Sequence, residues 1–184
     1  IAPSILSADF ANFGAEIQAI EAHGADWVHV DVMDGHFVPN LTFGPDVIAA
    51  CRSAVEIPFE AHLMVNTPEV MLAQYVDAGC ELVIVHAEST GHLHRCLGQV
   101  AEAGGRAAVA LNPSAPVSEV SHVLDLVDVL GDPEQRLQVT QTTFAFFHVR
   151  LDHIPFALFD MPGLPLCQFR LDKFASRSFE QICF

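Results

Sequence analysis

Segments with strand-like patterns alternate with helix-like segments through the first 130 residues of this 184-residue chain, about every 25 residues. A Gly closes a predicted helix and the next predicted strand begins soon after, as with Gly24 before Trp27 and Gly79 before Leu82. Strict alternation favours parallel strands joined by right-handed crossovers. The pattern therefore restricts the chain to a (β/α) barrel or a doubly wound open sheet.

The predicted elements cover most of this region. Helical spacing of apolar residues and Gly or Pro punctuation mark the helix-like segments. Those segments fall at about residues 9–24, 45–54, 67–79, 90–103 and 116–125. The strand-like segments fall at residues 3–8, 27–33, 58–65, 82–87 and 107–111, and a sixth begins at 128–130.

Polar residues on several predicted strands decide between the two folds. No Gly-x-Gly-x-x-Gly follows a predicted strand, which disfavours a dinucleotide-binding open sheet. Barrels instead assemble a site from the ends of many strands. We therefore expect an α/β fold, a TIM-type (β/α) barrel that is incomplete or irregular after its sixth strand. The polar residues are Ser4, His29, Asp31, His62 and His86.

Two of these strands carry residues that can bind a metal. Side chains alternate between the faces of a strand, so His29 and Asp31 share one face of residues 27–33. His62 and Glu60 likewise share one face of residues 58–65. If the two strands are parallel neighbours, His29, Asp31 and His62 converge at their C-terminal ends. From the spacing alone, a buried polar network without metal is an equal alternative.

The charge and the cysteines bear on partners and location. A formal net charge of −15 argues against nucleic acid and anionic membranes as partners. No apolar run reaches the roughly 18 residues of a membrane span. The five cysteines are odd in number and form no Cys-x-x-Cys pair, so we expect a reduced, cytoplasmic setting.

The composition changes near residue 130. Residues 1–130 hold 17 acidic and 3 basic side chains, whereas residues 131–184 hold 6 and 5. Nine of the 14 Phe residues follow residue 130. We therefore predict a (β/α) barrel portion with the metal and substrate site at 1–130, and a divergent Phe-rich tail at 131–184.

Several motifs of the first 130 residues occur in the order and spacing of a known family. Together they resemble the ribulose-phosphate 3-epimerase family, over some seventy per cent of the chain. After Leu130 the resemblance stops, because neither a Gly-rich phosphate loop nor an Asp-Gly-Gly motif follows. The matching motifs are Ala2–Asp9 (APSILSAD), His29–Gly35 (HVDVMDG), Phe37–Asn40 (FVPN), Ala61–Val65 (AHLMV), Val85–Glu88 (VHAE) and Ala110–Pro113 (ALNP).

The resemblance implies a role for each matching residue. It implies that His29, Asp31 and His62 are ligands of one divalent metal ion, with zinc, iron and manganese equally compatible. It further implies that Asp31 is a catalytic acid/base. Substrate contacts fall to Ser4 and His62, with two methionines lining the pocket around the reacting carbons, Met33 and Met64.

The resemblance also implies an activity. The family interconverts D-ribulose 5-phosphate and D-xylulose 5-phosphate in the pentose phosphate pathway, by proton transfer at C3 through an enediolate. We therefore expect an isomerase with a sugar phosphate as its small-molecule partner, assembled as a homo-oligomer. The alternative is a catalytically inactive, truncated or frame-altered isoform that lacks the second acid/base Asp and the phosphate loops. Orotidine phosphate decarboxylases are a weaker alternative, since no Lys precedes Lys173.

Overall fold

A single sheet organises the part of the chain that the computed structural model describes, residues 1–131 and 149–150. Its strands lie in the order β1-β2-β3-β4-β5-β6. Neighbours from β1 to β5 are parallel, and β6 pairs antiparallel with β5. The strands are β1 (Val28–Met33), β2 (Phe59–Met64), β3 (Cys80–His86), β4 (Arg106–Ala110), β5 (Val129–Gly131) and β6 (Val149–Arg150).

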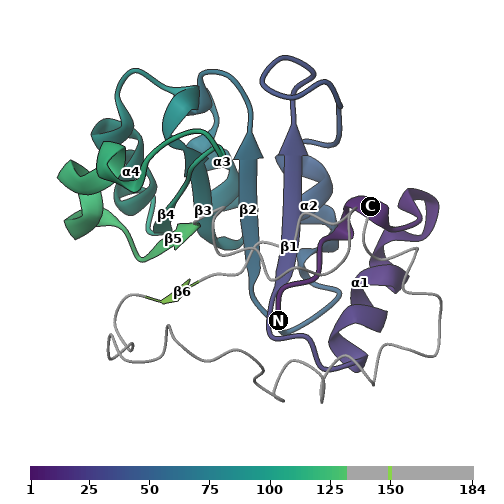
Figure 1. The fold of residues 1–184 in the computed structure, drawn as a ribbon. Coiled ribbons are helices and arrows are strands. Elements are labelled where there is room, and N and C mark those ends of the chain that lie inside the picture. The colour runs from purple at the N-terminus through teal and green to yellow at the C-terminus, as the bar shows by residue number, and fades with distance from the viewer. Residues whose placement is uncertain (132–148, 151–184) are drawn as a thin grey trace, which may run out of the picture.

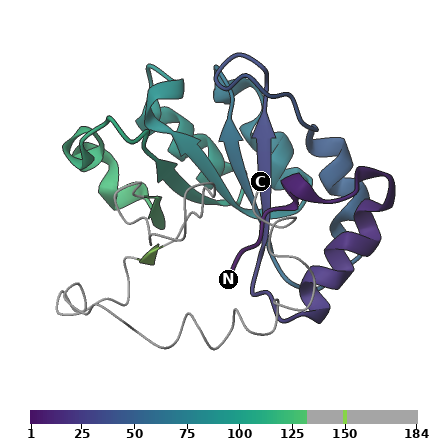
Figure 2. The same cartoon turned by 45° about the vertical axis from the view of Figure 1, so that its right-hand side comes forward.

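Helices connect the parallel strands and lie along one side of the sheet (Figures 1 and 2). Val28, Val30 and Val32 of β1 belong to the main core cluster, together with helix residues such as Ile17 and Ile48. The α-helices are α1 (Phe13–Ala22), α2 (Pro45–Arg52), α3 (Leu72–Asp77) and α4 (Leu93–Glu102). The 3₁₀ helices are η1 (Ile5–Ser7), η2 (Phe10–Asn12), η3 (Pro68–Val70), η4 (Ala87–Ser89) and η5 (Val117–Leu126).

The strand order distinguishes the two folds that the sequence allows. A doubly wound sheet reverses its strand order once and carries helices on both faces. Here consecutive strands are neighbours throughout β1 to β5, and the helices cover one face only. This arrangement is that of a (β/α) barrel, so the predicted fold class is confirmed. The described strands form an incomplete barrel wall, and the region predicted to become irregular lies mostly outside the described residues.

The face of the sheet opposite the helices has its own small apolar cluster. Leu82 and Ile84 of β3 meet Ala108 and Ala110 of β4 there, and Trp27 packs against them. The alternate residues of β3, such as Val83, belong instead to the core beneath the helices. The strands therefore have two distinct faces, and the polar residues of β1 and β2 lie on the face away from the helices.

The predicted first strand, residues 3–8, is wrong. Ser4 makes only an isolated parallel bridge to His29, and the chain then turns into η1. The Ser4 hydroxyl accepts the backbone N–H of Leu6 at 3.1 Å, so the side chain caps a 3₁₀ turn where a strand would continue. The predicted helix at 116–125 is also a 3₁₀ helix, η5.

Among the described helices, none combines the length and apolar character needed to cross a membrane.

Candidate metal centre

The register between β1 and β2 places four polar side chains opposite one another. His29 is the direct partner of Glu60, and Asp31 is the direct partner of His62. All four are buried, with exposed fractions between 0% for His62 and 7% for Asp31. Parallel pairing in register therefore brings the residues predicted on two separate strands into one buried cluster.

Three possible ligand atoms converge in this cluster. Asp31 Oδ1 lies 3.2 Å from His29 Nε2 and 3.1 Å from His62 Nδ1. Within the described residues, His29, Asp31 and His62 form the one group of three whose ligand atoms all lie within 4.8 Å of one another. Two imidazoles and a carboxylate are a donor set that suits divalent transition metals.

Buried partners hold the other nitrogen of each imidazole. His29 Nδ1 lies 2.6 Å from Glu60 Oε1, and His62 Nε2 lies 2.8 Å from His86 Nε2. Metal-binding histidines usually have a hydrogen-bonding partner at the nitrogen remote from the metal, which orients the ring. The partners of both rings thus match the arrangement of a metal centre.

The electrostatics of the cluster also favour a cation. Burial alone would lower the pKa of His29, but Asp31 and Glu60 outweigh burial and raise it to about 10. Burial alone would raise the pKa of Asp31, yet His29 and His62 lower it well below its usual range. Two buried carboxylates therefore create a negative potential, which a protonated His29 or a metal ion can neutralise.

Burial has the opposite consequence for the other two imidazoles. It lowers the pKa of His62 below its ordinary value, despite the hydrogen bond to Asp31. Burial, together with the neighbouring His62, lowers the pKa of His86 to about 3. Neutral imidazole is the form that provides a metal ligand, so His62 is in the right state to bind, whereas His29 would have to release its proton as a metal ion binds.

The predicted substrate residues surround the cluster. The Ser4 hydroxyl donates a hydrogen bond to Asp31 Oδ2, from the segment that bridges to β1. Met33 and Met64 are direct partners at the C-terminal ends of β1 and β2, and both are half-buried. The structure therefore brings Ser4, His29, Asp31 and His62 into contact. It places Met33 and Met64 opposite each other, two residues beyond Asp31 and His62 on the same strands. Their catalytic, substrate and metal roles stay predictions.

The loop after β1 reaches His86 through the side chain of Phe37. Asp34 Oδ1 accepts the backbone N–H groups of His36 and Phe37, and Asp34 Oδ2 accepts that of Asn66. The Phe37 ring then packs against His86, with 5.0 Å between ring centroids. Asp34 thus fixes the loop that places an aromatic ring beside the imidazoles.

The sequence placed Glu60 and His86 among the polar residues of the strands but assigned neither a role as ligand, acid/base or substrate contact. Glu60 shares a face with His62, but its contact with His29 depends on the register between two strands. His86 lies on a third strand, and only the geometry of the sheet shows that it contacts His62. Alternation within β2 marks Glu60 as inward-facing, whereas no local pattern predicts the contact of His86.

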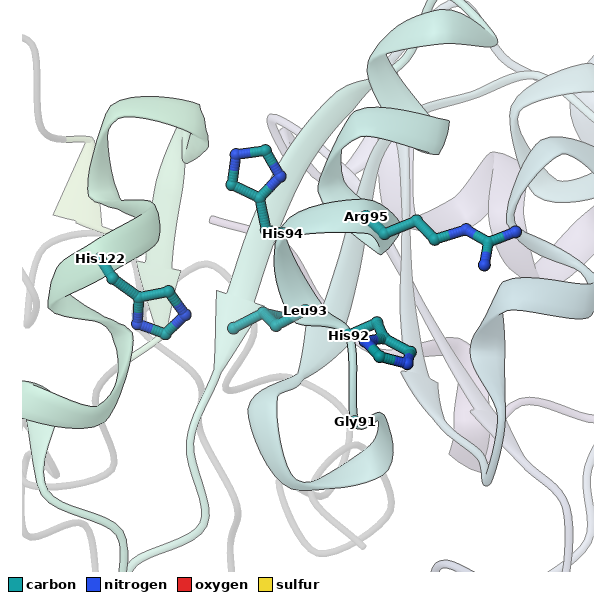
Figure 3. A pocket seen from close by; sticks show the side chains of 6 residues that line it. All are labelled: Gly91, His92, Leu93, His94, Arg95 and His122. Atoms are coloured by element: carbon teal, nitrogen blue, oxygen red, sulfur yellow. The ribbon is translucent and has the colours of Figure 1, made fainter.

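A shallow surface pocket lies at the N-terminus of α4 (Figure 3). His92 and His94 line it from the start of the helix, and His122 lines it from η5. All three imidazoles are exposed, unlike those of the buried cluster. Arg95 points away from His122.

Comparison with known protein sequences identifies one family. The model of the ribulose-phosphate 3 epimerase family matches residues 1–131. Ribulose-phosphate 3-epimerase of Rhodobacter capsulatus is 55% identical over 130 residues, which cover 71% of this chain and 57% of that protein. The chloroplastic ribulose-5-phosphate-3-epimerase of Arabidopsis thaliana is 48% identical over 132 residues, 71% of this chain and 47% of that protein. The chain spans about half the length of these relatives.

Proposed function

Because the chain belongs to the ribulose-phosphate 3-epimerase family, we propose that it is a metal-dependent epimerase of a sugar phosphate. The proposed reaction interconverts D-ribulose 5-phosphate and D-xylulose 5-phosphate. The convergence of His29 Nε2, Asp31 Oδ1 and His62 Nδ1 is the observation that supports this function most directly.

The proposed ligands of one divalent ion are His29, Asp31 and His62, and the ion is zinc, iron or manganese. A bound ion would supply Lewis-acid chemistry, which would stabilise the negative charge that develops when the C3 proton is removed. Glu60 orients His29, and the two buried carboxylates compensate the charge of the cation.

Asp31 is the proposed acid/base at C3. Despite burial, His29 and His62 lower its pKa, so Asp31 is ionised at neutral pH, and the same interactions make its carboxylate a weaker base than a free one. The Ser4 hydroxyl holds Asp31 Oδ2, so the carboxylate has a fixed orientation. Ser4 and His62 also contact the substrate in this proposal. Met33 and Met64 would exclude water from the intermediate, because their side chains are apolar and adaptable.

Inversion at C3 needs an acid/base group on each face of the planar intermediate, because one group removes the proton and the other returns a proton to the opposite face. Asp31 serves one face, and the sequence contains no Asp-Gly-Gly motif to serve the other. We therefore assign to the barrel portion, residues 1–130, the metal and the Asp31 side of the reaction, and full conversion then requires a second acid/base group that stands outside any Asp-Gly-Gly motif. The tail, residues 131–184, is a separate region, which the end of the family match at residue 131 supports. The homo-oligomer and the cytoplasmic location remain predictions from the sequence.

The experiment is a conversion assay with the full chain. The protein is stripped with a chelator, reloaded with Zn²⁺, Mn²⁺ or anaerobic Fe²⁺, and given D-ribulose 5-phosphate, and D-xylulose 5-phosphate is measured. We expect product from at least one loaded form, and none from the stripped chain or from His62→Ala. His122→Ala is the matched control, because this exposed imidazole on η5 is outside the cluster, and it should keep full activity. A folded chain that forms no product with any of the three ions would contradict the proposal and favour the inactive isoform.

A further inference from the structure

His86 is a buried imidazole that the proposed reaction does not use. It ends β3, is 4% exposed, and its ring is tilted by only 24° from the plane of the His62 ring, with 5.0 Å between the ring centroids. Its Nε2 lies 2.8 Å from His62 Nε2. Within the described residues, His86 Nδ1 is buried and makes no hydrogen bond. A buried polar atom without a hydrogen-bond partner lowers the stability of the fold, so the position of this nitrogen needs an explanation.

Two facing ring nitrogens can form a hydrogen bond only if one carries the proton and the other a lone pair. His62 Nδ1 faces Asp31 Oδ1 and must present a lone pair if it is to bind a metal. The proton of a neutral His62 then lies on Nε2 and points at His86. His86 Nε2 must then accept a hydrogen bond from this N–H group with its lone pair. Because a neutral imidazole carries one proton, that of His86 must lie on Nδ1.

Glu88 is the residue that can accept a hydrogen bond from the Nδ1–H of His86. Its Oε2 is 3.6 Å from His86 Nδ1, just beyond hydrogen-bond distance. Its Oε1 accepts the backbone N–H of Asn112 at 2.7 Å, which anchors the carboxylate. Phe37 packs on the His86 ring and restricts its rotation.

We propose that His86 and Glu88 form a positioning relay that presents the Nδ1 lone pair of His62 to the metal. His86 Nε2 accepts a hydrogen bond from the Nε2–H of His62, and the Glu88 carboxylate accepts a hydrogen bond from the Nδ1–H of His86. This inference rests on the metal centre proposed above. It assigns to His86 an influence on metal affinity without any contact with metal or substrate.

Imidazole nitrogen spectra of the full chain test the relay directly. The ¹⁵N-labelled protein is loaded with Zn²⁺, and long-range ¹H–¹⁵N correlations show which nitrogen of each ring carries hydrogen. We expect protonation at Nε2 of His62 and at Nδ1 of His86. A proton on His86 Nε2 in the zinc-loaded chain would overturn the relay, because His86 would then be a donor. This readout needs no variant and no activity.

Zinc affinity of two variants, measured by competition with a chromophoric chelator, is the second readout. His86→Leu removes the acceptor at similar volume, and loss of such a partner lowers metal affinity about 10- to 100-fold. His86→Gln keeps a carbonyl acceptor within reach, so most of the affinity should return. Val85→Ala is the matched control, because Val85 packs beneath the helices and its loss weakens the same strand without touching the relay. Equal affinity of His86→Leu and the unaltered chain would overturn the relay.

His29→Ala separates a wrong relay from a wrong metal centre. If His29→Ala binds zinc as tightly as the unaltered chain, the proposed metal centre is wrong and the relay with it. If His29→Ala loses zinc and His86→Leu retains it, the metal centre stands and the relay alone is wrong.

Discussion

Asp31 Oδ1 lies 3.1 Å from His62 Nδ1, because β1 and β2 pair these two residues directly in a parallel register. A shift of one residue in that register would turn His62 to the helix side of the sheet. The contact therefore links the fold to the proposed chemistry, since the apolar faces of two strands determine where the polar atoms meet.

Glu60 should influence metal affinity through His29. Its Oε1 lies 2.6 Å from His29 Nδ1, and Glu60→Leu removes that acceptor. We expect zinc affinity to fall about 10- to 100-fold, as is typical when the partner of a metal-binding histidine is lost. Glu60→Gln, which keeps a carbonyl acceptor, should lose less. Chelator competition measures both, and equal affinities of the two variants would show that the hydrogen bond is unimportant.

Tyr75→Phe should leave the fold as stable or more stable. Tyr75 is 0% exposed, and in the described part of the chain its hydroxyl makes no hydrogen bond. Burial of an unpaired hydroxyl costs free energy, so its removal should raise the free energy of unfolding by up to about 1 kcal/mol. Urea denaturation followed by circular dichroism gives the value. A loss of more than about 1 kcal/mol would mean that the hydroxyl has a partner.

Gly79→Ala should destabilise the fold more than Gly104→Ala. Both glycines have a positive φ, 99° and 90°, which costs alanine about 1 kcal/mol. A Cβ on Gly79 would also lie 2.8 Å from Cγ of Arg52, whereas a Cβ on Gly104 meets nothing within 4 Å. Arg52 cannot easily move, because its Nη1 donates to the backbone oxygen of Val55 and its guanidinium lies over Phe59. Equal free energies of unfolding in urea would contradict this difference.

Asp34 should make stability depend on pH in the acid range. Burial would raise the pKa of Asp34, but the backbone N–H groups of Asn66, His36 and Phe37 outweigh it and lower the pKa below the ordinary value of 3.8. A carboxyl whose pKa is lower in the folded state stabilises that state above its unfolded pKa, and the gain disappears as pH falls through the folded pKa.

Asp34→Asn tests that dependence. The variant should be less stable than the unaltered chain at pH 6, and the difference should shrink steadily below about pH 4 as Asp34 itself becomes neutral. Urea unfolding between pH 6 and pH 2.5 gives the comparison. A difference that stays constant over the whole range would contradict the lowered pKa.

The strands from Val28 to Gly131 were predictable because alternation and Gly punctuation report directly on a buried parallel sheet. The segment at 3–8 was not, since a single contact, from the Leu6 N–H to the Ser4 hydroxyl, turns the chain there. Apolar composition predicts a strand in this segment, and a side-chain cap overrides it.

The candidate site, too, could be predicted from the sequence only in part. Alternation alone predicted that His29 and Asp31 share a face, and the motifs of the family added Ser4, Met33 and Met64. The contact between His86 and His62 was not predictable, because it joins two strands across the sheet and depends on ring orientation. Local sequence patterns thus show which side chains face inward. Their hydrogen-bond partners on other strands can be identified only when the register of the strands in the structure is known.

Heavy-water exchange at C3 tests the central claim, that Asp31 transfers a proton beside a divalent metal ion. The metal-loaded full chain is incubated with D-ribulose 5-phosphate in deuterium oxide, and deuterium at C3 is measured alongside D-xylulose 5-phosphate. We predict that both appear and that Asp31→Asn abolishes them together. Deuterium without D-xylulose 5-phosphate would mean that Asp31 works on one face without a second acid. Exchange that survives in Asp31→Asn, or no exchange from the folded, metal-loaded chain, would contradict the account.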